Sequence, residues 1–463
     1  MATASDPPPA GTARAPARWR RWRAGLVLGA VVFVIHSLSP SPQSGDSRLS
    51  LVVAWQLLTT GSIDLSGIPT VEGLAWTGDL ISTADGRLVP FFPWPPMLLA
   101  LPGALILAAV GVDPAALSIS DPNLTWIVEV PTASLIVAVT AVVIRRLVLD
   151  AGDRWSTPGT AWIAAGAFAF ATIAWSTGSR ALWQQTVSML VLVLALLAIQ
   201  RRGRGGAWPY LIGVFAALAL VVRPTNVVIV VPLLAWMLVA AKPHALRGLL
   251  GGAAVLIAFL GLSWVFYGTA LPPYYLPTRL GDTPVYDLVE SLAVHLVSPG
   301  RGLLIYVPIA LLALVGVGLR MATRTMSGLQ VALGIGIIAQ IGIIAKFGST
   351  NGFTYGPRLL LDIVPLLVLL AVPTLAALPR PGGHRERRPL AVLAAVGVVA
   401  VLGWGLFVNA TGAATRAAVC WNVTPIAIDT APERVWDWSD PPFLRPWHDL
   451  ASGGAFFVGS CTS

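Results

Sequence analysis

The sequence predicts an all-α protein that crosses a membrane many times, and both its composition and its hydrophobic pattern indicate this. Hydrophobic residues make up 56% of the chain and charged residues only 11%, whereas a soluble domain carries about 25% charged residues. Apolar runs of roughly 18–24 residues, long enough to span a bilayer as helices, recur along the chain. The formal charge of +9 is assigned to cytoplasmic loops, because no compact basic domain is present to bind nucleic acid.

Eleven membrane spans are expected, the first near residues 24–38. The others lie near residues 124–147, 159–175, 183–200, 208–222, 227–241, 248–266, 302–319, 328–345, 358–377 and 389–409. A further apolar run near 97–112 is short and contains Pro102 and Gly103, so we expect it to lie in the outer interface instead of crossing. Excluding it places four arginine clusters on the inner face, as the positive-inside rule requires. These clusters occupy residues 145–154, 201–204, 320–324 and 380–388.

Three regions follow from this topology. They are a disordered basic cytoplasmic leader (1–23), a transmembrane domain (24–409) that includes a large extracytoplasmic loop (39–123), and an extracytoplasmic tail (410–463). The N-terminus is then inside and the C-terminus outside a bacterial plasma membrane. The tail contains both cysteines, Cys420 and Cys461. Outside the cytoplasm these form a disulfide or remain two unpaired thiols, and the sequence leaves both readings open.

Asp46, which follows the first span directly, is the candidate catalytic residue. It precedes a short amphipathic run that stops at Gly61. A carboxylate at the membrane surface beside Arg48 stays ionised and can accept a proton. The plainer alternative is a helix N-cap, a common role for an Asp-Ser pair before an apolar-periodic run.

Two other features of the first outer loop are candidates for the same site. Asp64, just beyond Gly61, could turn back toward Asp46 and act as a second acid that orients the base or holds a divalent cation. The tight D-x-D spacing of a metal site is absent from the sequence, so no metal or other cofactor is predicted, although a divalent cation stays possible. Residues 91–96, FFPWPP, form either an anchor at the lipid headgroups or an apolar ledge for a lipid tail or sugar.

Four arginines lie at outer ends of predicted spans, where the positive-inside rule does not expect them: Arg180, Arg223, Arg301 and Arg358. Together they predict an anionic ligand at the outer leaflet, because Arg binds phosphate in a bidentate manner. Each one taken alone is also consistent with an ordinary surface arginine. Tyr355 belongs to the YGPR turn that delivers the last of them to its span.

Several polar residues at the same outer ends complete the candidate set. Trp183 and Gln184 begin a span and could hydrogen-bond a sugar. His295 precedes the SPGRG segment and is a candidate for a titrating group. Glu129 lies inside a span near its outer edge, where it either pairs with an arginine or handles a proton.

The order of these features resembles the GT-C superfamily of membrane glycosyltransferases, particularly family 39 (protein mannosyltransferase-like) and the bacterial lipid A sugar transferases. The matching segments are Gly45-Asp46-Ser47, PFFPWPP at 90–96, SPGRG at 298–302, YGPR at 355–358 and the tail from Trp421 to Trp438. The first loop reads GDSR where many relatives have Asp-Glu, so Asp64 is the candidate for the second acid.

This resemblance implies a GT-C-like bundle with juxtamembrane helices in the first outer loop, a base aspartate in that loop and a polyprenyl-phosphate sugar donor. The expected reaction is inverting transfer of a hexosyl or pentosyl group to an extracytoplasmic glycan, lipid or protein, with Asp46 as base and Arg301 and Arg358 as phosphate ligands. The alternatives are a transporter or flippase for polyprenyl-linked glycans, or a ligase that moves a whole glycan. Transporters usually place their ionisable residues near the bilayer midplane, whereas here they gather at one face.

Overall fold

The computed structural model describes residues 15–43, 45–68, 71, 78–114, 122–276, 287–348, 352–376, 378, 389–454, 456 and 461. Within these residues the chain is helical, apart from one antiparallel hairpin of β1 (Leu80–Ser82) and β2 (Leu88–Pro90). The all-α fold class predicted from hydropathy is therefore confirmed.

Each of the eleven predicted spans contains a helix. These helices are α1 (Ala15–Ser37), α6 (Pro122–Asp150), α7 (Pro158–Phe170), α8 (Gln184–Arg201), α9 (Trp208–Val222), α10 (Val227–Ala240), α11 (Lys242–Tyr267), α14 (Ile309–Ala322), α15 (Gly328–Ala345), α16 (Val364–Leu375) and α17 (Pro389–Ala414). Among the described residues, six helices are long and apolar enough to cross a membrane. Helix α1 begins at Ala15, inside the predicted leader of residues 1–23, and residues 1–14 lie outside the described structure.

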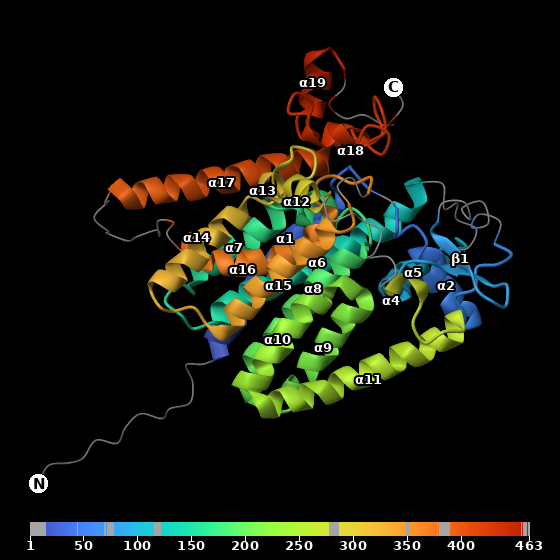
Figure 1. Cartoon of the computed structure of the whole chain (residues 1–463), viewed down its shortest axis with the longest axis horizontal. Helices are drawn as coiled ribbons and strands as arrows, with labels where there is room; N and C mark the ends of the chain where they lie inside the picture. The colour runs from blue at the N-terminus through green and yellow to red at the C-terminus, as the bar shows by residue number, and fades with distance from the viewer. Residues whose placement is uncertain are drawn as a thin grey trace, which may run out of the picture.

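The helices differ in how deeply they are buried. In the best apolar window of Arg358–Leu375, 89% of residues are buried inside the protein, against 22% for the corresponding windows of α11 and α17. Figure 1 shows the last two along opposite edges of the bundle. Helix α6 packs against α1, α7 and α8 in the interior, and α16 packs against α14 and α7. The interior helices therefore carry any site that must be shielded from lipid.

A separate layer covers one end of the bundle. It contains α2 (Ser50–Thr60), the hairpin, α4 (Trp94–Met97), a 3-10 turn η2 (Leu98–Ala100) and α5 (Leu101–Ala109). Gly61, at φ +72°, ends α2 where the sequence predicted. The run 97–112 forms short helices that pack against α2, and its place in the membrane interface stays a prediction. Trp94 packs against Phe259 and Phe266 of α11, which fixes the layer to the bundle.

Shorter elements connect the helices and form the tail. They are the π-helical turn η3 (Ala174–Gly178), the 3-10 turns η4 (Arg202–Arg204), η5 (Pro224–Asn226), η6 (Pro273–Tyr275), η8 (Arg358–Ile363) and η9 (Pro432–Trp436), and the helices α12 (Asp287–Val297), α13 (Leu303–Tyr306), α18 (Ala417–Cys420) and α19 (Arg445–Ala451). Figure 1 shows the start of α17 and the α14–α15 turn at the left, and α2, α4, α5 and β1 at the right. A disulfide joins Cys420 to Cys461, which settles the alternative that the sequence left open and suits a tail in an oxidising compartment.

Candidate active site

Asp46 lies in a turn between α1 and α2 and is not the N-cap of α2. The helix begins at Ser50, its N-cap position is Leu49, and no side chain caps it. The carboxylate of Asp46 instead forms an ion pair with Arg358, with 3.2 Å between Oδ2 and Nη2. The side chain of Asp46 is 24% exposed and that of Arg358 only 7%. The carboxylate is therefore accessible and has a fixed direction.

A small pocket with a cavity volume of about 10 Å³ opens beside this carboxylate. Its lining combines the turn after α1, the aromatic segment before α4 and the start of α8: Asp46, Ser47, Ser50, Phe92, Pro93, Pro96, Met97, Leu182 and Gln184. Part of the predicted FFPWPP ledge thus faces the predicted base across a cavity. The pocket therefore has an apolar wall on one side and the carboxylate of Asp46 on the other.

Arg358 is the first residue of η8, and two neighbours fix its position. Its guanidinium lies over the ring of Trp183, 4.2 Å from the ring centroid, which is a cation–π arrangement. Gly356 has φ +69°, and a Cβ there would lie 2.8 Å from the ring of Tyr306. Only glycine fits this turn, which explains the glycine in YGPR. The Nε atom of Arg358 is buried without a hydrogen-bond partner among the described residues.

Gln184 brings an amide group to the pocket. Its Nε2 donates to the hydroxyl of Tyr274 over 2.9 Å, while its buried Oε1 accepts from no group in the described part of the chain. The indole N–H of Trp183 donates to the backbone oxygen of Thr177. Trp183 therefore presents its ring face to Arg358, and Gln184 is the residue of this pair with a polar group left for a ligand.

Glu129 of α6 stabilises the turn that contains Asp46. Its Oε2 accepts from the hydroxyl of Ser47 at 2.6 Å and from the backbone N–H of Leu182 at 3.0 Å. The pairing with arginine that the sequence suggested is replaced by these two bonds. Because Ser47 follows Asp46 directly, Glu129 holds the base against the start of α8.

Arg301 lies close to Arg358 but is fully buried. Its guanidinium donates to the backbone oxygens of Thr354 and Gly352, and to the side-chain oxygen of Asn422 in the tail. Burial lowers the pKa of Arg301 to about 10, which leaves it charged at neutral pH. A Cβ on Gly352 would lie 3.1 Å from Nη2 of Arg358, so one loop separates the two arginines.

The other two predicted arginines bond within the protein. Arg180 is fully buried, donates to the backbone oxygens of His36 and Ser39 at the end of α1, and has its pKa lowered to about 9 by burial. Arg223 forms a buried ion pair with Asp362. The structure does not place either guanidinium in the lining of the Asp46 pocket.

Tyr355 and His295 also have internal partners. The hydroxyl of Tyr355 donates to the backbone oxygen of Val408 over 2.7 Å, and burial raises its pKa. Nε2 of His295 is 3.1 Å from the backbone oxygen of Gly348, and burial lowers the pKa of the imidazole to about 4. Both residues therefore fix the loops around the site instead of facing the pocket.

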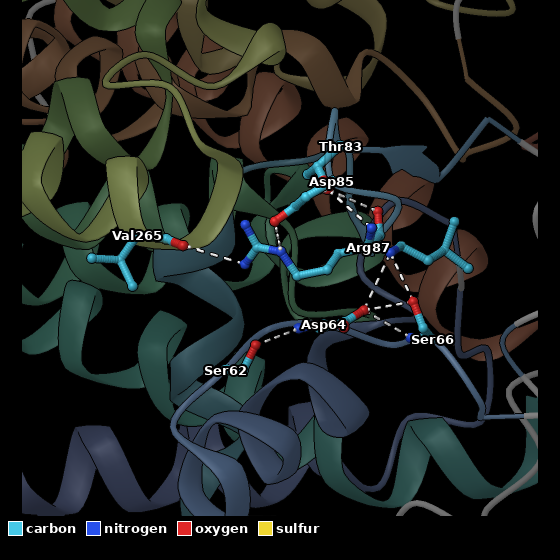
Figure 2. A network of polar contacts seen from close by, with 8 residues as sticks. Ser62, Asp64, Ser66, Thr83, Asp85, Arg87 and Val265 are labelled. Atoms are coloured by element: carbon cyan, nitrogen blue, oxygen red, sulfur yellow. Dashed lines mark hydrogen bonds and ion pairs between the residues drawn. The ribbon is translucent and has the colours of Figure 1, made fainter.

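Asp64 belongs to a different polar network, which Figure 2 shows from close by. Its Oδ1 accepts from the backbone and hydroxyl of Ser66 and from the backbone N–H of Leu88. The expected return of Asp64 toward Asp46 is not what the structure shows, because three hydrogen bonds hold its carboxylate on the hairpin. Across the described residues, no group of three His, Cys, Asp or Glu side chains is arranged to hold a metal.

Five chains of solved structures match this chain. The solved structure described as ArnT from Cupriavidus metallidurans bound to undecaprenyl phosphate matches with a TM-score of 0.48 and 14% sequence identity, over 88% of this chain and 69% of that one. No protein-family model matches the sequence. No curated protein matches it either.

Sequence reasoning missed three residues that shape the site. Asp362, the partner of Arg223, is a single acid within an apolar run, a signal that predicts a buried ion pair in a membrane helix. Tyr274 and Asn422 gave no such signal, because a Tyr in a loop and an Asn in a tail are common. Their roles depend on which segments the fold brings together.

Proposed function

We propose that the protein is a membrane glycosyltransferase of the GT-C type that takes a sugar from a polyprenyl-phosphate donor. The observation that carries this proposal is the Asp46–Arg358 ion pair at the mouth of a pocket lined by Phe92 and Gln184. A base, a phosphate-binding cation, an apolar wall and an amide then meet at one point. The motif resemblance over most of the sequence supports the same assignment.

In this mechanism, Asp46 accepts the proton of the acceptor hydroxyl. The hydroxyl oxygen attacks the anomeric carbon of the sugar, and the bond between that carbon and the phosphate oxygen breaks. The electron pair of that bond leaves on the polyprenyl phosphate, whose negative charge Arg358 stabilises. A single displacement of this kind inverts the anomeric configuration.

Arg358 also links donor binding to activation of the base. In the structure its Nη2 is paired with the Asp46 carboxylate. The donor phosphodiester is also an anion and competes for the same guanidinium, because Arg binds phosphate in a bidentate manner. Phosphate binding therefore weakens the ion pair, and the carboxylate becomes free to accept a proton. Donor binding thus precedes deprotonation of the acceptor.

The remaining residues have supporting roles in the proposal. Gln184 offers its unpaired amide oxygen to a sugar hydroxyl, and Phe92 offers an apolar face. Arg301 fixes the loop that precedes Arg358, and it acts through this loop instead of contacting the phosphate. The sugar is a hexose or pentose, and its acceptor lies on the extracytoplasmic side.

Two variants test the proposal: one is expected to lose transfer activity but keep donor-lipid binding, and the other is expected to weaken that binding. Asp46→Asn removes the base, so envelope glycan transfer in a complemented deletion strain falls at least about 100-fold, within the range of a lost general base. Because the same change frees Arg358, the purified variant binds undecaprenyl phosphate at least as tightly as wild type. Arg358→Gln weakens that binding about tenfold. Asp85→Asn, on the exposed hairpin, is the control and changes neither quantity.

Full transfer activity in Asp46→Asn would remove this residue from the mechanism. The alternative of a transporter is separated by measuring donor consumption in detergent, where no compartments remain. A transferase consumes the polyprenyl-linked sugar and releases polyprenyl phosphate under these conditions, whereas a transporter leaves the donor unchanged.

A further inference from the structure

A second cavity lies at the far end of α1, α6 and α8 from the Asp46 pocket. It has a cavity volume of about 450 Å³ and is lined by one face of each of these helices. The lining residues are Gly25, Leu26, Gly29, Ala30, Phe33, Leu135, Ala138, Val139, Val142, Val143, Arg145, Arg146, Leu197 and Arg201. It shares no lining residue with the pocket of the proposed transfer reaction.

The walls of this groove are apolar and open toward the surroundings of the bundle. Leu26 is 68% exposed, Leu135 is 54% exposed and Val139 is 39% exposed. Gly25 and Gly29 leave α1 without side chains on the face that meets Val142. An apolar trough of this shape, on a helix surface that faces the bilayer, accommodates a hydrocarbon chain.

The length of the groove matches one leaflet of a bilayer. From Leu135 to Arg146 along α6 the distance is roughly 16 Å at about 1.5 Å per residue. The hydrocarbon core of a bilayer is about 30 Å thick, so one leaflet is about half of that. The groove therefore ends in arginines where the headgroups of one leaflet lie.

The charged end of the groove has more cations than anions. Arg146 and Arg201 approach the same carboxylate, that of Asp150, with N–O distances of 2.7 and 3.7 Å. Arg145 is only 6% exposed and stacks over Trp162. The Nε atoms of Arg145 and Arg201 are buried, and they have no hydrogen-bond partner among the described residues. Three arginines thus line this end of the groove, and two of them have a buried Nε without a partner in the described structure.

We propose that this groove binds an anionic phospholipid of the leaflet at the N-terminal end of α1. One acyl chain lies between α1 and α6, and the lipid phosphate receives hydrogen bonds from Arg145 and Arg201. The surplus of positive charge favours an anionic headgroup over a zwitterionic one. The lipid fills the seam between α1 and the rest of the bundle, and therefore stabilises the helix that leads into the Asp46 turn.

The test compares two lipids with identical acyl chains, phosphatidylglycerol and phosphatidylcholine, on the full chain in detergent. Native mass spectrometry of the wild type is expected to show about tenfold more bound phosphatidylglycerol. Arg145→Gln combined with Arg201→Gln reduces this to the level of phosphatidylcholine. Arg247→Gln is the matched control, because Arg247 is an exposed arginine of α11 outside the groove, and it retains the full preference.

A second variant keeps the proposal testable if the double mutant does not fold. Val139→Trp keeps all three arginines and fills the apolar trough, so it reduces the retention of both lipids while inorganic phosphate still binds. Equal binding of the two lipids by wild type would overturn the proposal. Retention of the preference by the double mutant, or stronger competition by undecaprenyl phosphate than by phosphatidylglycerol, would overturn it as well.

Discussion

One short element, η8, carries two Arg–Asp ion pairs with opposite surroundings. Arg358 at its start pairs with Asp46, whose side chain is 24% exposed at the pocket. Asp362, four residues later, pairs with Arg223, and these side chains are 0% and 3% exposed. Gln340 also donates to Oδ2 of Asp362, and each pair leaves one buried atom without a partner in the described structure, Oδ1 of Asp362 and Nε of Arg358.

This difference shows that chemistry cannot be inferred from the residue types alone. We call the buried Arg223–Asp362 pair the sealed pair. Removing one of its partners lowers the stability of the protein, because the other charge is left buried. We call the partly exposed Asp46–Arg358 pair the open pair. Either of its residues can exchange the other for a ligand with little loss of stability. We therefore assign the Asp362 pair to stability and the Asp46 pair to function.

The largest expected effect separates the two pairs directly. Asp362→Ala leaves Arg223 buried without its counter-charge, so we expect the free energy of unfolding to fall by about 3–5 kcal/mol. Asp46→Asn, at the open pair, changes it by about 1 kcal/mol or less. Thermal unfolding of both variants in the same detergent measures the difference. Equal losses of stability would contradict the distinction between a sealed and an open pair.

A double variant sharpens the same comparison. Replacing the sealed pair by Arg223→Met and Asp362→Leu removes both charges, so much of the stability lost in Asp362→Ala returns. Transfer activity then persists, because neither residue lines the Asp46 pocket. Loss of activity in a stably folded double variant would instead give the sealed pair a role in the reaction.

The next effect concerns the tail, which contacts the loop before Arg358 through Asn422. The disulfide between Cys420 and Cys461 closes a loop with a sequence separation of 41, so removing it with Ser at both positions lowers the free energy of unfolding by about 2–4 kcal/mol. Asn422 next to this bridge bonds to Arg301, so the loop before Arg358 also becomes less ordered. Unfolding measured with and without reductant checks this; no change on reduction would contradict it.

The sequence was sufficient for most of the fold. An α-helix satisfies every backbone hydrogen bond within its own span, so apolar runs long enough to cross as helices predict the helices almost directly. The first helix is the exception, because the pattern that begins at residue 24 does not reveal that α1 starts at Ala15. The hairpin of β1 and β2 was also missed, because strands of three residues are too short to show an alternating pattern.

Only part of the site could be predicted from the sequence. Asp46, Arg358 and the aromatic segment were singled out, and the structure brings them together around one pocket. Arg180 and Arg223 were grouped with Arg358 because all three lie at outer span ends. Their different partners depend on tertiary packing: helix α1 ends beside Arg180, and Asp362 faces Arg223. The position of an arginine at a span end does not show whether its guanidinium bonds within the protein or remains available to a ligand.

A smaller effect is expected from His295, which binds Gly348 on the loop that leads toward Arg358. Burial lowers its pKa from 6.5 to about 4, so the unfolded state binds more protons between these values. Stability is then fully present above about pH 6.5 and falls as the pH approaches 4. Lowering the pH from 7 to 5 therefore removes about 2 kcal/mol.

His295→Gln is the matched variant for this pH effect. The Gln amide can still donate to Gly348, but it does not titrate. The thermal unfolding temperature of the variant is expected to change less than that of wild type between pH 7 and pH 5. An identical pH dependence in the two proteins would show that the lowered pKa of His295 does not contribute.

The smallest effect tests the second carboxylate of the outer layer, Asp64. Its Oδ1 accepts hydrogen bonds from Ser66 and Leu88, and an Asn oxygen can accept the same bonds. Asp64→Asn is therefore expected to lower the free energy of unfolding by about 1 kcal/mol or less and to leave transfer activity within about twofold, since no proton passes through this residue. If transfer instead fell as far as in Asp46→Asn, two carboxylates would share the reaction, and the ion pair with Arg358 would not be enough to distinguish the base.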